Sequence, residues 1–248
     1  MMNQYRLRIA ATSTALVLVA AGVMLPNRKV AAAGEGSITG TVKLSGTAPH
    51  MRGIDMSKDP YCVKANSTPV SMQNVMVSSS GGIQNVVLFI SEGLQGGAAS
   101  AVPSEEPTFD QHNCMYSPHV MAVDADQKFK VTNSDQTTHN IHPLPAPGST
   151  NIGWNKSQPP GAPPIDSSWK SAEAISVKCN IHPWMHGWHV VVKGPYAITD
   201  DNGNFTIKNV PPGTYTVTAW QEEYGTQTAK VTVAGGQAGK ADFTFKAK

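Results

Sequence analysis

Apolar and polar residues alternate in short runs along most of the chain, which is the pattern of β-strands with one buried face. Turn-forming pairs such as Asn202-Gly203 and Pro212-Gly213 separate the runs. No segment after residue 33 keeps an apolar period of 3.6 residues, so no long helix is expected. The sequence therefore predicts an all-β protein built of sandwich folds. The predicted strands are residues 37–44, 85–90, 119–123, 174–177, 188–192, 204–207, 214–220, 226–233 and 241–245.

Two stretches lack this alternation and are predicted to be loops. Residues 92–107 are rich in glycine, alanine, serine and proline, and residues 143–170 contain seven prolines.

The first 33 residues have the composition of a secretory signal. They contain four basic residues and no acid, with an apolar stretch over residues 9–25 and three alanines at residues 31–33. We expect cleavage after this segment and export to the periplasm or the extracellular space, with no membrane span in the mature chain. The alternative is an uncleaved anchor, because about 17 apolar residues lie at the lower limit for crossing a bilayer.

The charge of the chain depends on that segment. The full sequence has 19 Lys+Arg and 17 Asp+Glu, and removing the four bases leaves 15 against 17, a net charge of −2. The mature chain thus has no basic excess, and we expect no nucleic-acid partner. Its length of about 215 residues suits one large domain or two small ones.

The candidate chemistry is concentrated in one short loop and one distant strand. Cys179, His182 and Met185 lie within seven residues between two predicted strands, and His139 stands forty residues earlier. A copper ion that shuttles between two oxidation states prefers a thiolate and two imidazoles, with a weak thioether on the axis. These four residues are the candidate ligands of one such ion.

The spacing Cys179-x-x-His182-Pro-x-Met185 and the segment His139-Asn140-Ile-His resemble amicyanin and, more loosely, plastocyanin and pseudoazurin, all of the cupredoxin family. The resemblance covers residues 107–193. It implies a Greek-key β-sandwich with one type 1 (blue) copper, held by His139, Cys179 and His182 in the equatorial plane and by Met185 on the axis. It also implies that Asn140 ties the two ligand loops together by hydrogen bonds.

The same residue types also occur in roles that involve no blue copper. A lone cysteine in a β-protein is often a packing residue. A Cys-His₂ set also suits zinc, although methionine is a poor zinc ligand. A two-copper centre would need a second cysteine in the loop, and there is none.

The three cysteines are an odd number for an exported protein. If Cys179 binds metal, Cys62 and Cys114 are left to form a disulfide with each other. We therefore predict a structural disulfide between them, with a redox switch as the alternative.

Residues 199–220 resemble a second family, the carboxypeptidase regulatory-like (transthyretin-like) sandwich. A turn at residues 201–203, a Pro-Pro-Gly corner and two alternating strands carry the likeness, and residues 36–42 match its first strand. We expect a discontinuous sandwich of residues 35–100 and 195–248, interrupted by the cupredoxin domain over residues 107–193. The plainer alternative assigns residues 85–90 to the cupredoxin domain and leaves only 195–248 as a separate module.

These features predict an exported carrier of single electrons between redox proteins, not an enzyme. In cupredoxins the ring of the ligand that matches His182 reaches the surface among apolar residues. We therefore expect Pro183 and Trp184 to be exposed beside His182 and to form the docking patch. The alternative function is a surface or structural β-sandwich protein in which copper is stored or stabilises the fold.

Overall fold

The structure is a computed structural model that describes residues 34–94 and 103–248. The predicted signal segment, residues 1–33, lies outside the described residues, as does part of the predicted loop 92–107. The described residues form one compact unit of β-strands with a single short helix, so the all-β prediction is confirmed. Among them, no helix has the length and apolar character needed to cross a membrane.

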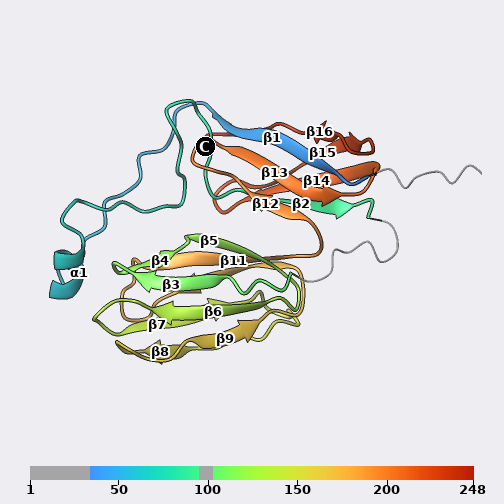
Figure 1. The fold of residues 1–248 in the computed structure, drawn as a ribbon. Coiled ribbons are helices and arrows are strands. Elements are labelled where there is room, and N and C mark those ends of the chain that lie inside the picture. Colours follow the sequence, from blue (N-terminus) through green and yellow to red (C-terminus); the bar gives the residue numbers. More distant parts are fainter. Residues whose placement is uncertain (1–33, 95–102) are drawn as a thin grey trace, which may run out of the picture. The chain divides into compact units, whose positions relative to one another are not determined.

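The first two strands and the last six form one pair of sheets, here called the terminal sandwich (Figure 1). One sheet has the order β13-β1-β16, with β17 also paired to β1, and the other has the order β12-β2-β14-β15. The inward residues of both sheets form one apolar core that includes Ile38, Leu88 and Val217, each with 0% of its surface exposed. The strands are β1 (Gly36–Ser45), β2 (Val87–Glu92), β12 (Tyr196–Ile198), β13 (Asn204–Val210), β14 (Gly213–Gln221), β15 (Gly225–Val233), β16 (Ala238–Lys240) and β17 (Phe243–Lys246).

The strands that lie between these in sequence form a second pair of sheets, here called the central sandwich (Figure 1). Its sheets have the orders β5-β11-β10-β7-β8 and β4-β3-β6-β9. Phe109, Phe129 and Ile141 are among the fully buried residues of its core. The strands are β3 (Thr108–His112), β4 (Met115–Ser117), β5 (Val120–Asp124), β6 (Lys128–Asn133), β7 (His139–Leu144), β8 (Lys156–Gln158), β9 (Ile165–Ser168), β10 (Glu173–Lys178) and β11 (His186–Val192).

One segment of the range 35–100, which was expected to belong wholly to the terminal sandwich, packs elsewhere. It contains the only described helix, α1 (Pro60–Ala65), whose first turn is capped by the carboxylate of Asp59. Met56 and Cys62 belong to the core of the central sandwich, and Cys62 forms the predicted disulfide with Cys114. The disulfide joins this segment covalently to the central sandwich.

Two further details concern the predicted loops and turns. The proline-rich stretch 143–170 contains the short strands β8 and β9, which pair with β7 and β6. Their few residues carry no clear apolar alternation, and only their neighbours supply the pairing. The predicted turn at residues 201–203 is present, where Gly203 has a φ of +79° and its N–H bonds to the carbonyl of Asp200 at 3.0 Å.

Candidate metal centre

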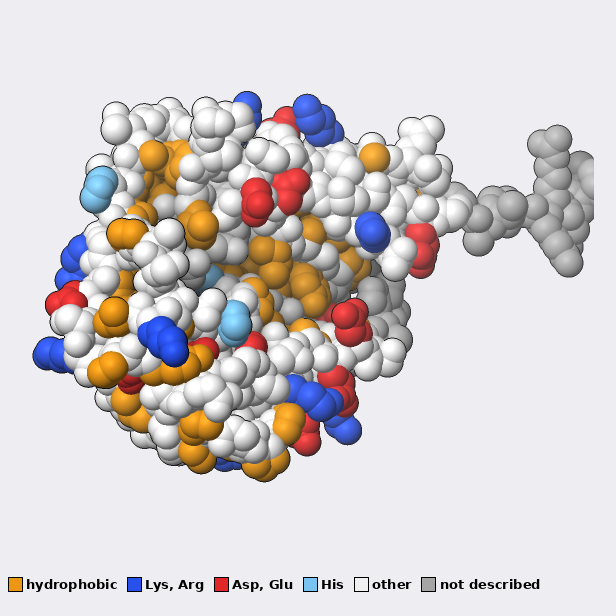
Figure 2. All heavy atoms as spheres, turned by 60° about the vertical axis from the view of Figure 1, so that its left-hand side comes forward, with side chains coloured by type: hydrophobic (Ala, Val, Ile, Leu, Met, Phe, Trp, Pro, Cys, Tyr) orange, Lys and Arg blue, Asp and Glu red, His pale blue; other side chains and the backbone are white. Residues whose placement is uncertain are grey.

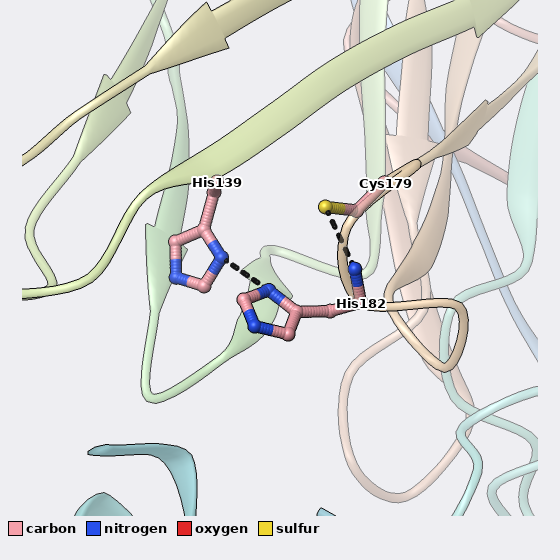
Figure 3. A group of neighbouring side chains, drawn as sticks. All are labelled: His139, Cys179 and His182. Atoms are coloured by element: carbon pink, nitrogen blue, oxygen red, sulfur yellow. Dashed lines mark hydrogen bonds between the residues drawn. The ribbon is translucent and has the colours of Figure 1, made fainter. Parts of the chain in front are cut away.

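The strand pairing of the central sandwich brings His139, Cys179 and His182 together. His139 opens β7, Cys179 directly follows β10, and His182 lies in the loop from β10 to β11. Because β10 pairs with β7 in antiparallel fashion, with Lys178 opposite His142, the end of β10 lies beside the start of β7. The two imidazoles and the sulfur all lie within 4.8 Å of one another and point toward a common centre (Figure 3). We call these three residues the His-Cys-His cluster.

The His-Cys-His cluster is closed to solvent. His139 is 0% exposed, and Cys179 and His182 are each 3% exposed. Met185, the fourth predicted ligand, is fully buried in the same core. The ligand loop is tightly closed, since the N–H of Met185 donates to the carbonyl of His182 at 2.9 Å and the N–H of Cys179 donates to the carbonyl of Met185 at 3.1 Å.

Each imidazole of the cluster turns one nitrogen inward and gives the other to a carboxylate. The Nδ1 atoms of His139 and His182 are 2.9 Å apart. Nε2 of His139 lies 2.7 Å from Asp135 and Nε2 of His182 lies 3.0 Å from Asp59. A carboxylate that accepts the Nε2 proton leaves the lone pair on Nδ1, which is the tautomer that a metal ion needs. Both rings are therefore prepared to bind an ion at the centre of the cluster.

Asp135 is itself held in place by the backbone. It is 1% exposed and accepts hydrogen bonds from the N–H groups of Asn113 and Cys114, each at 2.7 Å. Burial alone would raise the pKa of Asp135, but the hydrogen bonds from His139 and from these N–H groups lower it below its ordinary value. The group opposite His139 is therefore a carboxylate with a fixed orientation.

The thiol of Cys179 is set to ionise. Burial would raise its pKa, but the adjacent imidazole of His139 and hydrogen bonds from backbone N–H groups lower it below the ordinary value. One of these donors is the N–H of His182, 3.3 Å from the sulfur. A thiolate is the form of cysteine that binds metal.

Asn140 lies between the two loops that carry the cluster. Its Oδ1 accepts the N–H of Asn180 at 3.0 Å, and its Nδ2 donates to the carbonyl of Lys156 at 3.1 Å. The side chain thus links β7 to the residue that follows Cys179, the geometry that the resemblance implied for it.

The surroundings of His182 differ from the exposed ring edge that the sequence predicted. The segment around α1 covers the ring, because Asp59 contacts Nε2 and the sulfur of Cys62 lies 3.9 Å from the same nitrogen. Pro183 is exposed, but Trp184 is only partly exposed and donates its indole N–H to the carbonyl of Cys114 at 3.1 Å. A role of Pro183 and Trp184 in docking stays a prediction.

Sequence reasoning did not find the two carboxylates. Asp135 precedes His139 by four residues, and this short spacing was an available signal. Asp59 lies 123 residues from His182, and nothing in the local sequence of Asp59 marks it as a partner. Only the disulfide and the packing of α1 bring it to the site.

Comparison with known proteins gives one match to a family and several to solved structures. Residues 186–246 match the carboxypeptidase regulatory-like domain. That resemblance is confirmed. The match begins at the first residue of β11 and also covers the C-terminal strands of the terminal sandwich. No curated protein matches the sequence.

Solved structures similar to this chain include cupredoxins, the other family that the sequence resembles. A copper(I) form of an amicyanin mutant is 17% identical and covers 42% of this chain and 98% of its own, with a TM-score of 0.32. A purple cupredoxin from Nitrosopumilus maritimus is 16% identical over 35% of this chain and 100% of its own, with a TM-score of 0.30. A copper-containing nitrite reductase from Thermus scotoductus SA-01 is 14% identical over 41% of this chain and 25% of its own, with a TM-score of 0.32. We infer the chemistry of the site from its own side chains.

Proposed function

We propose that the protein is an exported type 1 copper protein that carries single electrons between redox partners. The observation that carries the proposal is the buried His-Cys-His cluster, in which both imidazoles turn Nδ1 inward while carboxylates hold their outer nitrogens. We assign His139, Cys179 and His182 as the main ligands and the buried Met185 as the weak axial one.

The donor set fits copper better than zinc. A thiolate is a soft ligand, two imidazoles suit both copper oxidation states, and a thioether adds affinity for Cu(I) but little for zinc. When bound, copper would supply a one-electron change between Cu(I) and Cu(II).

The residues around the His-Cys-His cluster would limit how far the ligands move when the ion changes oxidation state. The ligands are buried, the ligand loop is closed by its own backbone hydrogen bonds, and Asn140 ties that loop to β7. A site so constrained cannot rearrange much when the charge of the ion changes, which favours rapid electron transfer over bond-making chemistry. The same closure to water supports a carrier rather than an enzyme.

Charge supports a protein partner rather than a nucleic acid. Figure 2 shows acidic and basic side chains interspersed on the face in view, with apolar side chains gathered in a hollow at its centre and no continuous basic area there. The signal-like composition of residues 1–33 supports export, in which case donor and acceptor are exported redox proteins.

The test is copper titration of the metal-free protein. One equivalent of Cu(II) should produce an intense visible absorption, caused by charge transfer from the Cys179 thiolate, and Cys179→Ser should abolish it. His112→Gln changes an exposed histidine outside the cluster and serves as the matched control, which should keep the full absorption.

A second measurement separates the carrier from its alternative. The copper protein should exchange electrons rapidly with a small redox protein in stopped-flow mixing. A colourless protein that prefers zinc under competition would refute the copper assignment. A coloured protein whose copper does not change oxidation state during turnover with any redox partner would instead support storage or a structural role.

A further inference from the structure

A second group of side chains with potential metal-ligand atoms lies where the two sandwiches meet. His119 directly precedes β5, and His186 opens β11. These two strands pair in parallel fashion, and the N–H of Trp188 donates to the carbonyl of His119 at 2.9 Å. The two imidazole rings consequently meet edge to face, with their centroids 4.9 Å apart.

The terminal sandwich adds a carboxylate to this pair. Glu222 directly follows β14, and its side chain is 4% exposed. One carboxylate oxygen contacts Nε2 of His119. The other accepts the indole N–H of Trp188 at 2.8 Å and lies 3.7 Å from Nε2 of His186. We call His119, His186 and Glu222 the His-His-Glu cluster.

Two ring nitrogens of the His-His-Glu cluster lack hydrogen-bond partners among the described residues. Nε2 of His186 is buried yet has no hydrogen-bond partner among the described residues, and neither has Nδ1 of His119. A buried polar atom without a partner is destabilising, so such atoms in a native protein commonly point to a water or an ion. The free nitrogen of His186 faces the carboxylate of Glu222 across a gap wider than a hydrogen bond.

The spacing suits a small divalent cation. One nitrogen from each imidazole and one carboxylate oxygen lie within 4.8 Å of one another. In a tetrahedral zinc site, ligand atoms about 2.0–2.2 Å from the ion are roughly 3.4 Å apart, close to the gap between His186 and Glu222. An ion there would take the place of the proton shared by His119 and Glu222, and the indole of Trp188 would still orient the carboxylate.

We propose that His119, His186 and Glu222 form a second metal site, for a zinc-type divalent ion, that joins the central sandwich to the terminal one. Two imidazoles and a carboxylate leave a fourth position for water. The side chain of His186 is 22% exposed, so the site lies near the surface. The His-His-Glu cluster has no thiolate, so it should prefer a different metal from the His-Cys-His cluster. Soft Cu(I) favours sulfur, whereas zinc accepts nitrogen and oxygen.

The experiment measures zinc bound to the full chain after anaerobic loading with one equivalent of Cu(I). Equilibrium dialysis against Zn(II), followed by metal analysis, should give one zinc per chain in addition to copper. Glu222→Gln keeps the size of the side chain but removes its charge, and it should weaken zinc binding by at least about tenfold.

The neighbouring residue supplies the matched control. Glu223 also accepts a hydrogen bond from Asn74, at 3.0 Å, but lies outside the cluster, so Glu223→Gln should bind zinc as the unmodified chain does. If Glu222→Gln fails to fold, His186→Gln tests the same site, because it leaves the contacts of Glu222 with His119 and Trp188 in place.

Two outcomes would overturn the proposal. In one, the copper-loaded chain binds no zinc, so that the cluster is an internal hydrogen-bond network only. In the other, Glu222→Gln and His186→Gln bind zinc as tightly as the unmodified chain. Repeating the dialysis with Cys179→Ser separates zinc binding at the His-His-Glu cluster from the proposed electron transfer. The variant lacks the thiolate, but it should still bind the zinc ion that Glu222 holds.

Discussion

His189 offers a quantitative test of the core of the central sandwich. Its ring is 0% exposed and lies against Phe109 and Phe129, with ring centroids 4.5 Å and 5.0 Å away. Nδ1 accepts the indole N–H of Trp169 at 3.2 Å, and Nε2 has no partner among the described residues. A protonated ring would place an unpaired charge among aromatic side chains, so burial lowers the pKa of His189 from 6.5 to about 3.

The lowered pKa has a definite sign and size in the free energy of unfolding. Between pH 6.5 and about pH 3 the unfolded chain binds a proton at His189 that the folded chain does not. The contribution of the neutral His189 ring to the free energy of unfolding is therefore fully present above pH 6.5. Below that pH it falls by about 1.4 kcal/mol per pH unit. Between neutral pH and about pH 5 the loss from this one residue amounts to about 2 kcal/mol.

The assay is urea unfolding of the metal-free protein at about pH 7.5 and about pH 5, compared with His189→Gln. Glutamine keeps an acceptor for Trp169 but does not titrate, so the variant should lose about 2 kcal/mol less than the unmodified chain between the two pH values. His112→Gln, at an exposed histidine, is the control and should behave as the unmodified chain. Equal losses in the unmodified chain and in His189→Gln would show that the buried ring is not the source of acid sensitivity.

Three further predictions concern the surroundings of the His-Cys-His cluster. Replacing Cys62 and Cys114 together by alanine should lower the free energy of unfolding by about 4 kcal/mol, because the disulfide joins residues separated by 52 positions; a loss below about 1 kcal/mol in urea unfolding would contradict this. Asp135→Asn should cost about 3 kcal/mol in the same assay, since an amide cannot accept both backbone N–H groups and the imidazole of His139, and an unchanged midpoint would refute that accounting. Trp184→Lys should slow electron transfer to a fast redox partner while the visible spectrum stays unchanged; loss of the copper spectrum or of folding would instead assign Trp184 to packing.

Local patterns in the sequence determined the fold class and led to the predicted ligand set. Strand alternation and turn pairs depend on neighbouring residues, so they are readable without a structure. The spacing from Cys179 to Met185 is likewise local, and the loop between β10 and β11 contains Cys179, His182 and Met185. The pairing of Cys62 with Cys114 followed from counting cysteines once Cys179 had another role.

Only the tertiary structure decided which distant residues surround the predicted ligands. Asp59 contacts His182 because a disulfide holds the segment around α1 on the central sandwich. That segment covers the His182 ring, which the sequence analysis expected at the surface. His119 and His186 lie far apart in the sequence, yet the parallel register of β5 and β11 brings them together, and Glu222 joins them from the turn after β14. Such contacts depend on strand register and on the packing of one sandwich against another. Those properties belong to the whole chain, so no local spacing encodes them.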